Sequence, residues 1–293
     1  MISIIITACK EAKTIGKAIR RILKNKIPVN YEILVLAPDE DTLAGSEKYA
    51  KENKKIKVVR DFGNGKPAAL NLAFKEAKGE IFVLTDGDVF VSETAISKII
   101  EPLKNKKIGA ACSRPVSLNR RNKMLGFWSH LLTDTVHNLR KKSEKKKKFF
   151  FCSGYLYAIR SNIVESIPEN ILVEDGYISY LIRENGYEIA YVPEAEVYVK
   201  YPDNIKDWLK QKVRSAGGYV QLKDISGFEI RSFKTEASGV FDVLAYPKGF
   251  KEYFWTLCLL FFRLYLWALI FYVFRIKKEK SFKKIWKRVE STK

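Results

Sequence analysis

The stretch Ile81-Phe82-Val83-Leu84-Thr85-Asp86-Gly87-Asp88 joins a short apolar run to two acids that are separated by one glycine. The apolar part, Ile81 to Thr85, predicts a buried β-strand, and the acids follow it in a turn. Two carboxylates in this Asp-x-Asp arrangement can direct their oxygens at one hard cation, which can in turn neutralise a diphosphate. The alternative is an ordinary polar turn, because short strings of this kind are common. The position directly after a strand favours a metal site.

Before this stretch the sequence alternates between strand and helix patterns. It predicts strands at 2–7, 31–36 and 56–60 and helices at 11–24, 42–53 and 67–77. The alternation indicates βαβ units and a parallel sheet that is buried on both faces. Ligands of such sheets bind beyond the carboxyl ends of the strands, so we expect a site near the residues that follow Thr7, Leu36, Arg60 and Thr85.

The sequence after this stretch has a more varied pattern. It predicts strands at 108–113, 149–159 and 188–192 and helices at 124–139, 173–185 and 204–220. The helix at 124–139 carries an apolar stripe of Leu125, Trp128 and Leu132. An almost wholly apolar run, Phe254 to Phe274, and a basic tail, Arg275 to Lys293, complete the chain.

Two further groups of polar residues belong to predicted helices. Glu174 and Asp175 begin the helix at 173–185, where acids also stabilise a helix N-terminus through its dipole. In the functional interpretation, one of these carboxylates is a general base that deprotonates an acceptor hydroxyl. Gln211 and Arg214 share one face of the helix at 204–220. Arg214 can hold a diphosphate or an acceptor phosphate, although a solvated amphipathic helix has the same pattern.

Composition limits the chemistry that this chain can perform. The four cysteines are scattered without zinc-site spacing, which predicts free thiols in a reducing cytosol. The chain has only two histidines, so we expect no His-centred triad and no poly-His metal site. Any metal should therefore be held by oxygen, which indicates Mg²⁺ or Mn²⁺. Because no signal peptide precedes the first strand, we expect the N-terminal domain to stay in the cytosol.

The order of these motifs resembles that of the family 2 glycosyltransferases. The matching segments are SIIITACKEAKTIGKAI (3–19), YEILVLAPDED (31–41), GKPAALNLAF (65–74), GEIFVLTDGDV (79–89), SGYLYAIR (153–160), VEDGYISYLIRENGYEIAYVPEA (173–195) and QKVRS (211–215). Each motif is weak alone, but the ordered set is specific and covers about residues 1–220. The resemblance implies a Rossmann-like α/β domain of the GT-A type and a nucleotide-diphosphate sugar donor. It also implies inversion at the anomeric carbon by direct displacement.

The resemblance further implies roles for individual residues. Asp88 would be the main metal ligand, with Asp86 beside it in contact with the nucleotide or the metal. Asp175 would be the catalytic base, supported by Glu174. The remaining substrate-binding residues would be Thr7, Ala8 and Glu11 in the nucleotide pocket, Asp39 and Lys66 near base and ribose, Gly154 on the acceptor side, and Gln211 and Arg214 in the Q-x-x-R-W motif.

Three positions depart from the family pattern. Thr7-Ala8-Cys9-Lys10-Glu11 stands where the family usually has Pro-Ala-Tyr-Asn-Glu, and Ala37-Pro38-Asp39-Glu40 where it has Asp-Asp-x-Ser. Ser215 replaces the Trp of the last motif, which weakens the inference of processive polymer synthesis. The metal and base positions match the pattern, so we expect an active enzyme.

The apolar run from Phe254 to Phe274 is about as long as a helix needs to be to cross a bilayer core. Arg263 near its middle makes insertion costly unless the side chain is paired or snorkels. The tail after it is strongly basic and should favour the cytosolic side. A helix lying in the interface satisfies a cytosolic tail, whereas a single crossing does not. We expect attachment to an anionic membrane, by a spanning or an in-plane helix, with an amphipathic tail whose apolar residues are Phe282, Ile285, Trp286 and Val289.

Together these features predict a glycosyltransferase at the cell membrane, with a cytoplasmic catalytic domain and a lipid-linked or glycan acceptor. Its expected divisions are a nucleotide-sugar half (1–110), an acceptor half (111–220), a connector (221–253), an apolar membrane segment (254–274) and a basic tail (275–293). A sugar-phosphate nucleotidyltransferase would need a Gly-rich loop after the first strand, and Cys9-Lys10-Glu11 has no glycine. A basic scaffold is supported only by the net charge of +20. Acids at two separate strand and helix ends would repel a nucleic acid, so we expect none as a partner.

Overall fold

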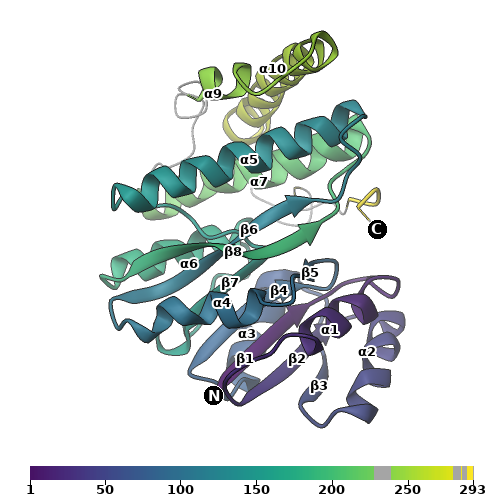
Figure 1. The fold of residues 1–293 in the computed structure, drawn as a ribbon, viewed down its shortest axis with the longest axis vertical. Helices are drawn as coiled ribbons and strands as arrows, with labels where there is room; N and C mark the ends of the chain where they lie inside the picture. The colour runs from purple at the N-terminus through teal and green to yellow at the C-terminus, as the bar shows by residue number, and fades with distance from the viewer. Residues whose placement is uncertain (228–238, 280–284, 286–288, 293) are drawn as a thin grey trace.

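The computed structural model describes residues 1–227, 239–279, 285 and 289–292 and has one β-sheet with helices on both faces (Figure 1). The strands are β1 (Ile2–Thr7), β2 (Tyr31–Ala37), β3 (Ile56–Arg60), β4 (Ile81–Asp86), β5 (Phe90–Val91), β6 (Ile108–Ser117), β7 (Leu156–Arg160) and β8 (Glu188–Val199). The α-helices are α1 (Ile15–Leu23), α2 (Glu40–Glu52), α3 (Lys66–Glu76), α4 (Ala95–Ile100), α5 (Met124–Lys145), α6 (Glu174–Glu184), α7 (Ile205–Ser226), α9 (Val240–Leu244) and α10 (Phe250–Phe271), which continues as a π-turn (Tyr272–Ile276).

The strand order in the sheet is β3-β2-β1-β4-β7-β6-β8-β5. The first four strands are parallel, as the alternation of strand and helix patterns predicted. Beyond β4 the sheet is mixed, because β7 runs antiparallel to both β4 and β6, and β5 runs antiparallel to β8. Thr7 at the end of β1 pairs with Leu36 on one side and Asp86 on the other. The carboxyl ends of β1, β2 and β4 therefore lie side by side.

Two apolar cores hold the helices against the sheet. Successive strand residues point to opposite faces, so Ile4 lies in one core and Ile5 in the other. Helices α1, α2 and α4 cover the first face, and α3 and α6 cover the second. The buried residues of α1 recur at helical spacing, which is why this helix packs along a single stripe.

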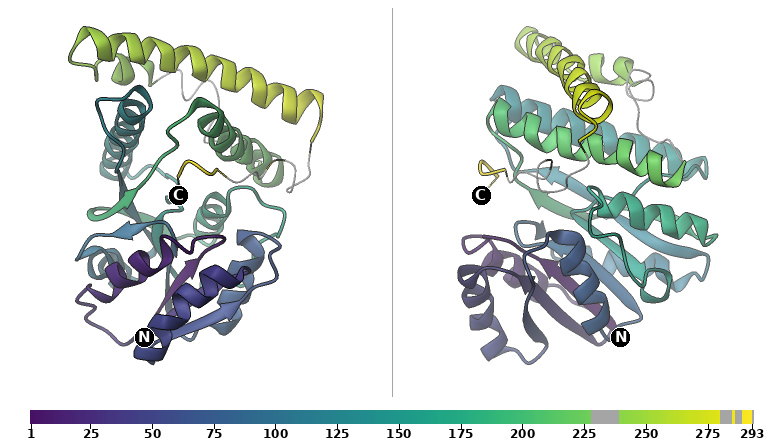
Figure 2. Two further views of the ribbon diagram at one scale, coloured as in Figure 1. Left: turned by 90° about the vertical axis from the view of Figure 1, so that its right-hand side faces the viewer. Right: turned by 180° about the vertical axis from the view of Figure 1, so that it is seen from behind.

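A separate layer of long helices lies beyond the sheet (Figure 2). α10 lies across α5 and α7, and the three helices share a core that includes Trp128, Trp208 and Leu266. The Trp128 ring lies 5.4 Å from that of Trp208 on α7 and 5.8 Å from that of Phe262 on α10. The predicted stripe of α5 therefore packs on other helices. In the described chain, Phe250–Ile276 is the one helix long and apolar enough to cross a membrane, by length and composition only.

The strand predicted at 149–159 was wrong in its first half, since β7 contains only Leu156–Arg160. The backbone N–H groups of Cys152 and Ser153 donate to the Ser179 hydroxyl and to the Cys112 sulfur, and so are not available to a neighbouring strand. The apolar side chain of Phe151 packs on Tyr219 of α7. Apolar residues there form a loop that packs against the helices.

Four other elements are longer than predicted, the first being β6, which continues to Ser117 and not only to Ser113. The strand expected at 188–192 continues to Val199, because the pairing with β6 shifts register between Ser113 and Arg114 and so passes the residues around Pro193. Helix α5 continues to Lys145 through much of the basic run, and α7 continues to Ser226. In the tail, Phe282 and Trp286 lie outside the described residues, and Ile285 and Val289 are buried.

Candidate active site

The two acids of the Asp-x-Asp stretch lie at the carboxyl end of β4, beside the end of β1. Asp86 is the last residue of β4, and its Oδ1 accepts a hydrogen bond of 3.1 Å from the Thr7 hydroxyl. The Gly87 N–H donates to the Thr7 carbonyl at 3.0 Å. A Cβ at Gly87 would lie 2.7 Å from the Cβ of Ala8, so glycine allows this turn to pack on β1. Asp88, which follows, is half-buried.

Lys66, the first residue of α3, joins Asp86 to Glu174. Its Nζ lies 2.7 Å from Asp86 Oδ1 and 2.7 Å from Glu174 Oε1. The side chains are 18%, 26% and 13% exposed for Lys66, Asp86 and Glu174 respectively, so the pairs are only weakly screened by water. Burial alone would lower the pKa of Lys66, but the two carboxylates outweigh it and raise this pKa. Lys66 therefore remains a cation between two acids that come from distant parts of the chain.

Glu174 and Asp175 are adjacent at the start of α6 but differ in proton affinity. Burial opposes ionisation of Glu174, yet the Lys66 cation holds its pKa below the usual value. Burial and then the charge of Glu174 raise the pKa of Asp175 to about 6, although Lys66 and the N–H groups of Gly176 and Gly154 act in the other direction. The pair thus consists of one carboxylate that is ionised at neutral pH and one that exchanges its proton near pH 6. Such a carboxyl group suits general base chemistry.

Gly154 brings the backbone before β7 close to Asp175. A Cβ at Gly154 would lie 3.1 Å from Asp175 Oδ2, closer than an ordinary van der Waals contact. The other oxygen, Asp175 Oδ1, accepts a hydrogen bond of 2.8 Å from the Gly176 N–H. The Asp175 carboxyl is therefore held between two backbone segments. The structure brings Gly154 and Asp175 together from segments 21 positions apart in the sequence.

The residues expected around the nucleotide lie at the ends of β1 and β2. Asp39 caps α2. Its carboxylate accepts hydrogen bonds from the Thr42 N–H at 3.1 Å and from the Lys10 N–H at 2.5 Å. Partial burial would raise the pKa of Asp39, but these hydrogen bonds outweigh it and lower this pKa. The Glu11 carboxylate is buried and accepts from the Thr14 hydroxyl at 2.8 Å. Asp39 and Glu11 thus hold the loop after β1 in place. Lys66, expected near base and ribose, contacts Asp86 and Glu174.

Asp61 lies in the segment after Arg60 that the sequence pattern indicated, but it was not named as a site residue. It follows β3 directly, is buried, and accepts from the Gly63 N–H at 2.7 Å. Burial and the nearby Asp39 raise its pKa. Its position after the third strand was a sufficient signal, because the carboxyl ends of parallel strands share one edge. Asp39 and Asp61 make this edge acidic near the expected nucleotide pocket.

Helix α7 carries Gln211 and Arg214 past the same region. The Arg214 charge contributes to the lowered pKa of Glu174 and acts on the Tyr155 hydroxyl, so Arg214 lies near the acid cluster. Gln211 is half-buried one turn earlier on α7. The structure therefore brings Arg214 to the side of Glu174, whereas no contact from Gln211 to the acids is observed among the described residues.

The chemistry of the donor set fits a hard divalent cation. Asp86 and Asp88 offer carboxylate oxygens at one turn, the ligand type preferred by Mg²⁺ and Mn²⁺. Within the described ranges, no group of three or more His, Cys, Asp or Glu side chains could hold a metal alone. A cation at this turn would therefore take its other ligands from water or from a bound phosphate, as Mg²⁺ commonly does.

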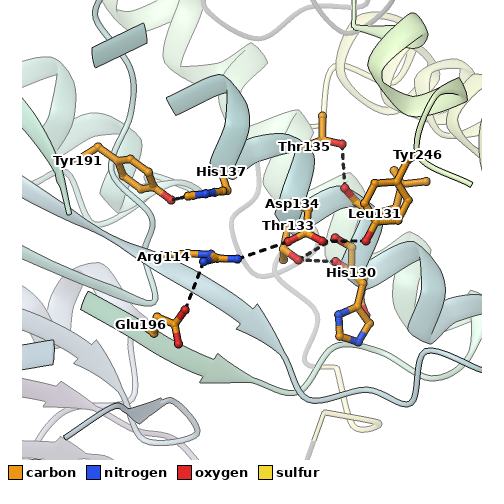
Figure 3. Close-up of polar contacts among 11 residues, drawn as sticks. Arg114, His130, Leu131, Thr133, Asp134, Thr135, His137, Tyr191, Glu196 and Tyr246 are labelled. Carbon is orange, nitrogen blue, oxygen red and sulfur yellow. Dashed lines mark hydrogen bonds and ion pairs between the residues drawn. The ribbon is translucent and has the colours of Figure 1, made fainter. Parts of the chain in front are cut away.

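Both histidines lie in a different polar cluster, between the sheet and α5 (Figure 3). Arg114 of β6 contacts Glu196 of β8 at 3.3 Å and Asp134 of α5 at 3.8 Å. Asp134 also accepts a hydrogen bond of 2.8 Å from the hydroxyl of Tyr246, which follows α9. This bond connects the outer helices to the sheet through Asp134 and Arg114. His137 Nδ1 lies 2.7 Å from the Tyr191 hydroxyl, and His130 Nε2 lies 2.9 Å from the Asn119 carbonyl oxygen. The histidines thus join α5 to its neighbours and lie outside the acid cluster.

A mixed sheet with acids at the carboxyl ends of its parallel half is consistent with the GT-A class of glycosyltransferases. Residues 1–218 match the family described as "Glycosyltransferase like family 2". The chain therefore belongs to the family 2 glycosyltransferases.

Known proteins of this class resemble the chain over most of its length. It is 26% identical over 286 residues to the probable glycosyltransferase YdaM of Bacillus subtilis, covering 93% of this chain and 66% of that protein. It is also 26% identical over 231 residues to poly-beta-1,6-N-acetyl-D-glucosamine synthase of Staphylococcus epidermidis, covering 76% and 56%. The chain thus spans less than two thirds of the length of these relatives.

One solved structure extends the comparison to the fold. The mannosyltransferase PcManGT from Pyrobaculum calidifontis, in complex with GDP-Man and Mn²⁺, superposes with a TM-score of 0.61 at 18% identity. The superposition covers 97% of this chain and 82% of that one. At this identity the likeness concerns the fold alone.

Proposed function

We propose that this protein is an inverting glycosyltransferase that moves a sugar from a nucleotide-diphosphate donor to a membrane-associated acceptor. The observation that carries the proposal is the acid cluster itself. Asp86 and Glu174 share the Lys66 cation, and Asp175 beside them has its pKa raised to about 6. One carboxyl group is thus tuned for proton transfer beside an ion-paired cluster that includes Asp86 of the Asp-x-Asp turn.

The donor diphosphate is proposed to bind at the turn after β4. Asp86 and Asp88 would hold a divalent cation, which would neutralise the charge of the leaving diphosphate. The Mn²⁺ and GDP-Man in the PcManGT structure support this choice of cation and of donor class. Thr7, Ala8, Asp39 and Asp61 would then surround the nucleoside, since they lie at the adjacent ends of β1, β2 and β3.

The chemical step is proposed to use Asp175 as the base. Its carboxylate takes the proton of an acceptor hydroxyl while that oxygen bonds to the anomeric carbon from the face opposite the diphosphate. The bond between the anomeric carbon and the phosphate oxygen breaks in the same step, and the electron pair leaves with the diphosphate. Glu174 stays ionised on Lys66 and keeps the proton affinity of Asp175 high. Arg214 would contact the diphosphate or the acceptor.

The acceptor is proposed to be lipid-linked or otherwise held at the membrane, with the catalytic domain in the cytoplasm. The apolar helix Phe250–Ile276 supports attachment, and the clusters of Lys and Arg at 140–148 and 275–278 fit an anionic surface. In this view residues 1–110 form the donor half and 111–220 the acceptor half. The polymer synthase among the curated relatives is consistent with a glycan acceptor.

Turnover of nucleotide sugars tests the proposal directly. We would measure hydrolysis and transfer with a panel of UDP-, GDP- and other nucleotide sugars, with Mn²⁺, with Mg²⁺ and with EDTA. At least one donor should turn over in the presence of metal and not with EDTA.

Asp88→Asn should abolish metal-dependent donor binding, because a neutral oxygen replaces an anionic ligand. Glu93→Gln, an exposed acid next to α4, is the matched control. Unchanged metal-dependent binding by Asp88→Asn would contradict the assignment.

A further inference from the structure

The outermost helix, α10, has two apolar faces. One face is buried against α5 and α7 and includes Leu259, Leu266 and Ile270. The contact continues to the π-turn, where a Cβ at Gly217 of α7 would lie 2.2 Å from the ring of Phe274. Helix α10 is therefore packed through one side on the two helices beneath it, while most of its surface stays exposed (Figure 2).

The opposite face of α10 exposes large apolar side chains that recur every three or four residues. Leu257, Leu264 and Phe271 stand seven residues apart and are 60%, 58% and 60% exposed. The remaining exposed large apolar residues of α10 on this surface are Phe250, Tyr253, Phe254, Phe261 and Tyr265. Soluble monomers rarely expose an apolar strip of this length, so the strip indicates a binding surface. We call it the outer face of α10.

Exposed cations stand at both ends of the outer face. Lys248 and Lys251 lie at its start, and Arg275, Lys277 and Lys278 at its end. A helix with an apolar face and basic ends matches an anionic lipid surface, where the cations meet headgroups and the apolar side chains enter the acyl boundary. The charge complementarity selects an anionic membrane as the occupant of this face.

A membrane-crossing arrangement conflicts with the packing of α10. Crossing would immerse all sides of the helix, yet one side lies on α5 and α7. Arg263 follows Leu259 by four residues and precedes Ile270 by seven, so it lies on the packed side. Helix α5 exposes Lys141, Lys142 and Lys145, which cannot enter lipid with it. Crossing would require α10 to separate from its core.

We infer that α10 lies in the plane of an anionic membrane, with its outer face in the lipid and its other face on α5 and α7. The inference rests on the membrane attachment in the proposed function and adds its geometry. Helix α7 contacts the π-turn after α10 at Gly217 and brings Arg214 to the acid cluster one turn earlier. A lipid-held acceptor can therefore approach Asp175 along α7 from the membrane surface.

Depth-dependent fluorescence quenching distinguishes the two arrangements. Single cysteines replace Leu257, Leu264 and Phe271 in a protein without Cys9 and Cys258; the buried Cys112 and Cys152 stay in place. Each variant is labelled with bimane and bound to phosphatidylglycerol–phosphatidylcholine vesicles that carry bromine near the headgroup or near the chain end. An in-plane helix predicts equal quenching at all three sites, strongest from the shallow bromine. Val29→Cys, exposed on the sheet side, should show no quenching.

Three results would overturn the inference, and each one identifies a different arrangement or binding surface. Deep quenching at position 264 with shallow quenching at 257 and 271 would establish a crossing helix. Absence of vesicle binding together with a dimer in light scattering would assign the outer face to a second copy of the chain. Removing phosphatidylglycerol should weaken binding about tenfold or more, and unchanged binding would exclude the anionic surface. Donor hydrolysis without vesicles reports separately on the proposed chemistry.

Discussion

Replacing Lys66 with methionine tests the acid cluster at its centre. The substitution keeps most of the apolar stem and removes the ammonium that lies 2.7 Å from both Asp86 and Glu174. Removing one partner of a buried ion pair costs about 3–5 kcal/mol, because the remaining charge is left unpaired in a poorly solvated site. The Asp86 side chain is 26% exposed and can be partly hydrated, so we expect a loss of stability at the lower end of this range, about 3 kcal/mol.

Urea unfolding in detergent, with and without Mn²⁺, measures this loss. Lys57→Met is the matched control, since Lys57 also makes a 2.6 Å ion pair, with Glu76, but at 55% and 38% exposure. Exposed pairs contribute little to stability, so the control should unfold close to the wild-type midpoint. A loss in Lys66→Met no greater than that in Lys57→Met would refute the bridge between Asp86 and Glu174.

A second substitution separates the bridge from simple packing. In Lys66→Met/Glu174→Gln the unpaired charge of Glu174 is removed as well, so part of the lost stability should return. The proton affinity of Asp175 provides an independent readout. Lys66 lowers the pKa of Asp175, so in Lys66→Met the fall of transfer at acid pH should begin at a higher pH than in the wild type. An unchanged pH profile would place Lys66 out of electrostatic contact with Asp175.

Three further predictions concern the base. Asp175→Asn should retain donor affinity within about threefold and lose transfer by about 10²–10⁴, because the base acts on the acceptor; calorimetry with the donor and radiolabel transfer separate the two effects. Lost affinity with retained turnover would make Asp175 a donor-site residue. In the wild type, transfer at saturating substrates should fall as pH drops through about 6, since the raised pKa of Asp175 leaves it protonated and inactive below that value. A flat profile from pH 5 to 8 would exclude Asp175 as the titrating base. Gly154→Ala should lower transfer but not donor binding, because the added methyl would lie 3.1 Å from Asp175 Oδ2. In the control Gly249→Ala the added methyl meets no atom within 4 Å, so transfer should not change. Equal rates in the two glycine variants would show that the Gly154 segment does not position the base.

Most of the parallel half of the sheet was predictable from the sequence. Runs such as Ile2–Thr7 and Ile81–Asp86 are apolar because both faces of a central parallel strand are covered, and the amphipathic helices between them have a different period. Local pattern decides these elements, so no distant contact was needed. The acids after β4 were identified for the same reason, since parallel strands bring their carboxyl ends to one edge.

The mixed half of the sheet depended on contacts that no local pattern records. The apolar residues at 149–155 could form a strand, yet the N–H groups of Cys152 and Ser153 bond to side chains of α6 and β6. The strand predicted at 188–192 continues to Val199, because a register shift on β6 carries β8 past Pro193. In both cases the choice of hydrogen-bond partner was made by a segment far away in the sequence.

The sequence alone determined which residues carry charge, and the tertiary structure decided which of them meet. Lys66, Asp86 and Glu174 are each ordinary polar residues at a strand end or helix start, and their spacing contains no sign of the shared ion pair. The raised pKa of Asp175 likewise depends on burial and on a neighbour's charge, which exist only in the folded chain. The apolar length of α10 was equally visible in the sequence. Its packing on α5 and α7 was not, because hydropathy measures how apolar a helix is and not which of its faces another helix covers.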